Sequence, residues 1–269
     1  MSAGVIVGAH PWVYASRREG YDIFPILGQV IEDVAAAGFE GLELMHTVLR
    51  HEHAVEVIGD LSRRHSLPII GSSFGGPMWD AAQRQAVLDA AAVVVQGVQR
   101  LGGRTLGVST GKAPARKTPE QLDHQAEVLC EVDRMCAAAG LTMNLHNHTY
   151  EVEDGEYEVS ETLRRFPEAR LGPDLDWLTR AGIDPCDFLR RHGDRVVFLH
   201  LRDNRDGRWV ESVGEGEMDF TGIRTVLDEI GFSGPAVVEL AWESGFEPTR
   251  PLRESLRLSR EHIRRTMGW

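Results

Sequence analysis

Four residues that can bind a metal ion or move a proton recur along the second half of the chain. His146, Asp174, His200 and Glu239 are separated by 28, 26 and 39 residues, and each stands at or near the end of a short apolar run. Two imidazoles and two carboxylates form a mixed nitrogen and oxygen set, which suits Mn²⁺, Zn²⁺, Fe²⁺ or Co²⁺ better than Mg²⁺ or Ca²⁺. We therefore predict one divalent metal ion bound by these four residues, where it would act as a Lewis acid.

Other polar and aromatic residues stand near the ends of the same runs or of neighbouring ones. His148 follows His146 by two residues, so both can lie on one side of a strand. The spacing alone does not distinguish which of the two binds the metal ion and which acts as the base. We expect His148 and Glu239 to be the catalytic residues that move protons. Asp176 could instead cap the following helix, and the tryptophans could be ordinary packing or platforms for a sugar or aromatic ligand. The residues expected to bind substrate are His10, Trp12, Glu151, Asp176, Trp177 and Arg202.

Eight short apolar runs must position these residues. They are rich in Val, Ile and Leu without regular polar alternation, which is typical of strands buried on both faces. Between them lie segments of helical period with recognisable start and stop signals, such as Thr118-Pro119 at one beginning and Gly140 at the corresponding end. The predicted strands are Val5–Ala9, Gly41–Met45, Pro68–Ser72, Thr105–Ser109, Leu141–His146, Arg170–Asp174, Arg195–Leu201 and Pro235–Leu240.

Eight strand–helix units in 269 residues predict an α/β fold, a (β/α)₈ TIM barrel that forms a single domain over residues 1–269. The alternative is an open doubly wound sheet, but no G-x-G-x-x-G follows the first strand to support its nucleotide-binding form. In such barrels the chemistry lies at the carboxyl ends of the strands, which is where the polar residues above stand.

Composition excludes several classes of protein. The chain has 29 basic and 41 acidic residues and a net charge of −12, which argues against a nucleic-acid partner. No run approaches the roughly 18 apolar residues of a membrane span, and the start Met1–Val5 lacks the pattern of a signal peptide. The three cysteines, Cys130, Cys136 and Cys186, have no metal-binding spacing and fit a reducing compartment. We expect a cytoplasmic protein without a membrane partner.

Four segments resemble a known superfamily. They are Leu171–Trp177 (LGPDLDW), Val197–Asp203 (VFLHLRD), Val213–Phe220 (VGEGEMDF) and Val237–Glu239 (VVE). This pattern resembles the xylose isomerase-like sugar isomerases and epimerases, a superfamily that also includes inosose dehydratase and endonuclease IV relatives. The resemblance implies the barrel and one divalent metal, with Mn²⁺ as the first expectation. The matching ligand positions are Asp174, His200 and Glu239, with His146 at the place of the strand-five ligand.

The strand-five position departs from the sugar epimerases of this superfamily, which usually have Glu there. This sequence reads His146-Asn147-His148, so one half of their two-carboxylate mechanism is missing. An imidazole can still act as a base near neutral pH.

The expected function is a divalent-metal-dependent sugar isomerase or epimerase, working by proton abstraction and a metal-stabilised enediolate on a ketose, inosose or keto-sugar. The alternative is a lyase of the same superfamily, either inosose dehydratase-like or a C-glycoside deglycosidase that eliminates an aglycone from a 3-keto-glycoside. Two further alternatives are an endonuclease IV-like phosphodiesterase and a non-catalytic sugar-binding barrel. The expected partners are a small sugar, polyol or sugar conjugate and further copies of the chain in a homo-oligomer, with a second subunit if the protein is deglycosidase-like.

Overall fold

A curled parallel sheet surrounded by helices forms the framework of the protein. The computed structural model describes residues 4–269; the first three residues, on which the predicted lack of a signal peptide partly depends, lie outside it. Within that range seven strands pair in the order β5-β4-β3-β2-β1-β9-β6. They are β1 (Val7–His10), β2 (Gly41–Met45), β3 (Ile69–Gly75), β4 (Thr105–Ser109), β5 (Thr142–Leu145), β6 (Leu199–Leu201) and β9 (Ala236–Glu239). All their pairings are parallel, as the predicted barrel requires.

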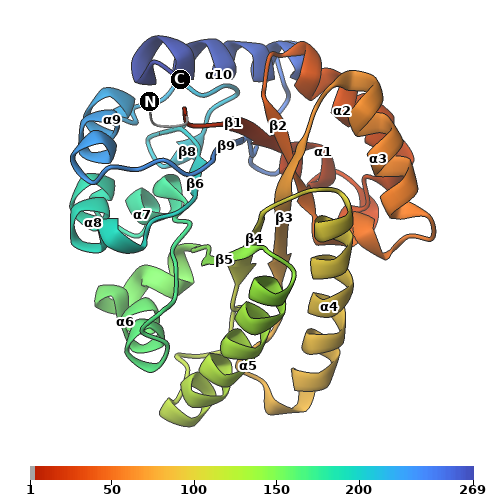
Figure 1. Cartoon of the computed structure of the whole chain (residues 1–269). Coiled ribbons are helices and arrows are strands. Elements are labelled where there is room, and N and C mark those ends of the chain that lie inside the picture. The colour runs from red at the N-terminus through yellow and green to blue at the C-terminus, as the bar shows by residue number, and fades with distance from the viewer. Residues whose placement is uncertain (1–3) are drawn as a thin grey trace.

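The helices lie outside the strands (Figure 1). They are α1 (Trp12–Ala15), α2 (Leu27–Ala36), α3 (Ala54–His65), α4 (Arg84–Arg100), α5 (Pro119–Ala138), α6 (Thr149–Arg165), α7 (Leu175–Arg180), α8 (Pro185–His192), α9 (Phe220–Glu229) and α10 (Leu252–Met267). Short 3₁₀ turns occupy Glu19–Tyr21, Phe24–Ile26, His46–Arg50, Ala81–Gln83 and Gly193–Arg195. No helix within residues 4–269 is both long and apolar enough to cross a membrane.

The eighth predicted strand, at residues 170–174, closes the ring without becoming a regular strand. Leu171 bridges to Leu145 of β5 and to Val196, and Asp174 bridges to His200 of β6. Pro173 has no N–H to donate, which interrupts the ladder. The side-chain amide of Asn147 compensates, because it donates to the backbone carbonyl of Asp174 at 3.3 Å and accepts from its N–H at 3.2 Å. The (β/α)₈ barrel predicted from the sequence is thus the fold of the protein.

Local sequence signals set the helix that follows β4. Thr118 caps α5 by accepting from the N–H of Gln121, whose side chain in turn accepts from the N–H of Thr118. Pro119 occupies the first helical position, where no backbone donor is needed. Gly140 then takes a φ of +72°, the left-handed conformation that turns the chain into β5.

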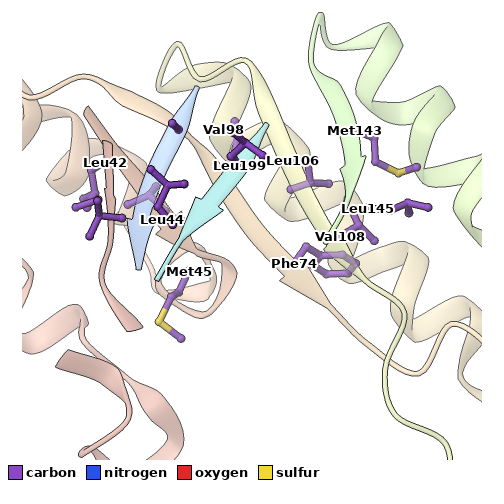
Figure 2. Packing of buried hydrophobic residues seen from close by; sticks show 14 of the residues in the cluster. Leu42, Leu44, Met45, Phe74, Val98, Leu106, Val108, Met143, Leu145 and Leu199 are labelled. Carbon is purple, nitrogen blue, oxygen red and sulfur yellow. The ribbon is translucent and has the colours of Figure 1, made fainter. Parts of the chain in front are cut away.

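The hydrophobic core lies largely between the sheet and its helices. Figure 2 shows part of it, with Leu106 and Val108 of β4 beside Met143 and Leu145 of β5. A smaller cluster of Ile70, Phe198 and Val237 fills the barrel interior. Alternate residues of a strand share a face, so the next inward positions after Phe198 and Val237 are His200 and Glu239. The apolar interior therefore forms a floor beneath the predicted site.

Candidate active site

A cavity of about 380 Å³ opens at the carboxyl ends of the strands, where the sequence predicts the site. Its polar lining comes from β1, β3, β4, β6 and β9 and from the segments after β2, β5 and β6. Its aromatic lining comes from β3, from the first turns of α1, α6 and α7, and from β8 (Arg208–Trp209). Among the lining residues are His10, Trp12, His46, Ser73, Phe74, Ser109, His146, His148, Tyr150, Trp177, His200, Arg202, Trp209 and Glu239. This volume is within the range of small-molecule sites.

Three of the four predicted metal ligands converge in this region. His146, Asp174 and His200 each offer one donor atom within 4.8 Å of the others. The Nδ1 atoms of His146 and His200 are 2.9 Å apart. Two imidazole nitrogens and one carboxylate oxygen, from a half-buried His146 and the buried Asp174 and His200, fit a first-row divalent cation. The donor chemistry of these three residues therefore matches the cation that the sequence predicts.

Glu239 lies beside this group but is not part of it. Its Oε2 atom is 3.3 Å from His200 Nδ1, while its Oε1 atom is 2.6 Å from Arg202 Nη2. The same guanidinium donates from Nε to Asp174 Oδ2 at 2.6 Å. Arg202, predicted to bind substrate, therefore bridges two predicted ligands. Its Nη1 atom has no hydrogen-bond partner among the described protein atoms.

The histidines of the cluster differ in charge. Burial and the neighbouring His200 and His148 lower the pKa of His146 well below its ordinary value, so its imidazole is neutral. Burial would also lower the pKa of His200, but Glu43 and Glu239 outweigh it and raise that pKa to about 9. His200 therefore holds a proton on Nδ1 and donates it to His146 across the short contact, and a cation bound at Nδ1 would displace that proton.

Glu43 is a member of the site that the sequence reasoning did not assign. It lies in β2 with no exposed surface, and its Oε2 atom accepts from His200 Nε2 at 2.6 Å. The available signal was a charged residue in the middle of an otherwise apolar predicted strand, Gly41–Met45. The partner could not be identified, because 157 residues separate the two.

His148 stands at the beginning of α6 and lines the cavity. Its Nδ1 atom is 3.4 Å from Glu151 Oε2 and 3.3 Å from Ser109 Oγ. The ring stacks on Tyr150 with an interplanar angle of 9°. These contacts fix the ring, and they leave Nε2 as the nitrogen available to a substrate.

Two residues predicted to bind substrate, Glu151 and Asp176, do not line the cavity in the described part of the chain. The Glu151 carboxylate accepts from the N–H of His148 at 2.7 Å and from Ser109 Oγ at 3.0 Å. Asp176 is fully buried and accepts from Trp209 Nε1 at 2.8 Å. Asp174, and not Asp176, caps α7. Both carboxylates therefore hold other parts of the site in place.

Trp209 is a cavity residue that the sequence reasoning missed. It belongs to a hairpin of β7 (Asn204–Arg205) and β8 (Arg208–Trp209). The turn residues Asp206-Gly207 were the signal for this hairpin. Trp12 and Trp177, predicted as platforms, line the same cavity. The ring of Trp209 packs edge-on against that of Trp177 at 5.2 Å, so the two form one aromatic wall.

Burial and charge also define the states of His10 and Glu239. Burial lowers the pKa of His10, whose Nε2 lies 3.0 Å from Ser73 Oγ. Burial would raise the pKa of Glu239, but Arg202, His10 and His200 together lower it to about 2. Glu239 is therefore a carboxylate and a weak base in this arrangement.

Comparison with known proteins agrees with this fold. The family model described as xylose isomerase-like TIM barrel matches residues 31–262. The rhizopine catabolism protein MocC of Rhizobium meliloti is 24% identical, over 82% of this chain and 72% of its own length. An inosose dehydratase of Klebsiella pneumoniae is 22% identical, over 89% and 90%. The structure of D-allulose 3-epimerase from Methylomonas sp. superposes with a TM-score of 0.76 at 17% identity, covering 99% of this chain and 100% of that one.

The family model covers well over half of the chain. This protein therefore belongs to the xylose isomerase-like TIM barrel family. An inosose dehydratase is thus among the proteins similar to it in sequence, and a D-allulose 3-epimerase is among those similar to it in fold.

Proposed function

We propose that the protein is a divalent-metal-dependent sugar isomerase or epimerase that moves a proton on a carbon next to a carbonyl group. The main support is the convergence of donor atoms from His146, Asp174 and His200, because the two histidines line the cavity together with His148. A divalent cation held there would polarise the carbonyl and make the neighbouring proton more acidic. Glu239 remains the proposed fourth ligand, because its Oε2 atom lies 3.3 Å from His200 Nδ1.

His148 is the proposed base. Its Nδ1 atom faces Glu151 and Ser109, so Nε2 would take the substrate proton while the electron pair of the C–H bond enters an enediolate. Return of the proton to the neighbouring carbon isomerises the sugar, and delivery to the opposite face epimerises it. Glu239 is the proposed second proton carrier, and its contact with Arg202 would have to loosen before it could accept a proton. Arg202 Nη1 and His10 are the proposed donors to substrate oxygens.

A lyase is the second candidate. The same proton removal followed by loss of a group from the next carbon is an elimination, and an inosose dehydratase is among the relatives. The aromatic wall of Trp177 and Trp209, with Trp12 also lining the cavity, would accommodate a sugar conjugate as well as a free sugar. Both candidates share the cation, the base and the first step, and they differ in the fate of the enediolate.

Metal analysis tests the site. We expect the purified protein to bind about one Mn, Fe, Co or Zn ion per chain, and the variants His146→Ala, Asp174→Ala and His200→Ala to lose it. His148→Ala should keep the ion. His46→Ala is the matched control, because His46 lines the same cavity but is not part of the cluster. Stoichiometric metal in His146→Ala, Asp174→Ala and His200→Ala would mean that the cation binds elsewhere.

Solvent-deuterium exchange tests the chemistry. The metal-loaded protein, incubated in D₂O with ketoses, inososes and 3-keto-glycosides, should incorporate deuterium into one of them. His148→Ala should abolish exchange while retaining metal. Recovery of an isomerised or epimerised sugar would support the first candidate, and recovery of an unsaturated or aglycone product the second. Exchange at the wild-type rate in His148→Ala would rule out His148 as the base.

A further inference from the structure

The carboxylate of Glu43 is a buried charge inside the barrel. One of its oxygens, Oε2, is 2.6 Å from His200 Nε2, while the other, Oε1, has no hydrogen-bond partner among the described protein atoms. A buried carboxylate oxygen without a donor costs stability, so such a residue calls for a physical explanation. The apolar floor of Ile70, Phe198 and Val237 shows that the interior of this barrel can be filled by hydrocarbon side chains.

The contact with Glu43 determines which nitrogen of His200 faces the cluster. Because Nε2 donates to Glu43, Nδ1 is the nitrogen that points toward His146, at 2.9 Å. An imidazole ring has only these two nitrogens, and a carboxylate acceptor on one of them fixes both the ring orientation and the lone pair on the other. The ring also contacts the rings of Phe198 and His10 edge-on, with centroid distances of 5.4 and 5.6 Å.

We propose that Glu43 is the positioning residue that presents His200 Nδ1 to the divalent cation. This inference rests on the proposed function, because it assumes that His200 is a ligand. Glu43 itself does not line the cavity and is not one of the three converging donors. Its role is exerted through His200 alone.

A purely structural role makes a different prediction. If Glu43 only completed the packing of the barrel, its replacement would lower the stability of the metal-free protein and leave the cation affinity of the folded fraction unchanged. A positioning role predicts that affinity falls in protein that remains folded. Loss of a carboxylate behind a metal-binding histidine weakens metal binding by about 10- to 100-fold in general.

The test uses Co²⁺ as the probe, since its visible absorption reports the ligands and their geometry. Wild-type protein, Glu43→Leu and Glu43→Gln are stripped with a chelator, checked by circular dichroism and urea unfolding, and titrated with Co²⁺. We expect Glu43→Leu to bind about 10- to 100-fold more weakly with an altered spectrum. Glu43→Gln should lose less, because its amide oxygen can still accept from Nε2. Asp33→Asn is the matched control: Asp33 is a buried carboxylate of α2 that contacts Tyr14 and Arg253.

The outcomes separate the two hypotheses. Failure of the wild type to bind Co²⁺ would remove the proposed cation site itself. Binding by the wild type, with both Glu43 variants within about threefold of it and with the same spectrum, would overturn the positioning role alone. If Glu43→Leu does not fold, Glu43→Met decides, because it keeps the length of the side chain and removes the acceptor of His200 Nε2.

Discussion

Replacement of Lys117 by Met would leave the carboxylate of Glu158 buried without its cation. The two groups are 2.6 Å apart, and their side chains are only 2% and 9% exposed. Lys117 Nζ also donates to Gln125 Oε1 at 2.8 Å and to Thr110 Oγ1 at 3.1 Å. Breaking a buried ion pair by removing one partner costs about 3–5 kcal/mol, because the remaining charge is uncompensated. We expect Lys117→Met to lose stability in that range.

A second variant separates loss of the pair from loss of packing. In Lys117→Met/Glu158→Gln no charge remains buried, so most of the lost stability should return. Lys112→Met is the control, since Lys112 is an exposed lysine in the same loop and its replacement should change stability by no more than about 0.5 kcal/mol. Urea unfolding followed by circular dichroism gives the free energy of unfolding of each variant.

The loss should depend on pH. Burial lowers the pKa of Lys117 and raises that of Glu158. Without Lys117 the pKa of Glu158 in the folded protein rises further, while in the unfolded chain it stays near 4.5. The folded state then holds a proton that the unfolded state releases, so stability falls as pH rises above the unfolded pKa. The deficit of Lys117→Met relative to the wild type should therefore be larger at about pH 8 than at about pH 5.

Two results would refute this reasoning. One is a loss for Lys117→Met below about 1 kcal/mol, which would show that the pair contributes little. The other is a double variant no more stable than the single one, which would assign the loss to packing. The position of the pair makes the result relevant to the site: Thr110 donates to Glu158 at 2.6 Å and lies 3.5 Å from Glu151, which holds His148.

Three further predictions concern other parts of the structure. A Cβ atom at Gly172 would collide with the amide of Asn144, so Gly172→Ala should displace the segment that holds Asp174. We expect urea unfolding to show about 1–3 kcal/mol of lost stability and Co²⁺ titration to show weaker binding. Wild-type values in both assays would contradict this prediction. Burial raises the pKa of Cys136 to about 12, so its thiol should resist alkylation at pH 8 until the protein is denatured. Mass spectrometry of the digested protein measures the labelling. Rapid labelling of the native protein would contradict this and would indicate that α5 opens. Trp209→Ala removes part of the aromatic wall and a hydrogen-bond donor to Asp176. We expect calorimetry to show weaker sugar binding and metal analysis to show an unchanged metal content. Loss of metal would mean instead that the β7–β8 hairpin supports the metal ligands.

Much of the fold follows from short-range sequence patterns. Apolar runs without alternation predicted strands buried on both faces, and Thr118-Pro119 and Gly140 predicted the ends of α5. These signals act within a few residues, which is why they are visible in the sequence. The conformation of residues 170–174 was harder to predict, because Pro173 and Gly172 weaken the hydrogen-bond ladder of this segment. Asn147, from another part of the chain, supplies hydrogen bonds to Asp174 in place of that ladder.

The sequence also determined which residues stand at strand ends, and parallel strands in a ring bring those ends together. It could not determine side-chain direction or partners between distant segments. Arg202 bridges Asp174 and Glu239, and Glu43 meets His200 across 157 residues. Glu151 and Asp176 are not among the cavity-lining residues, and their carboxylates accept hydrogen bonds from His148 and Trp209. Closure of the barrel determines these contacts, because it packs inward side chains from many strands into one small volume. A charge buried there is stable only beside a group that compensates it.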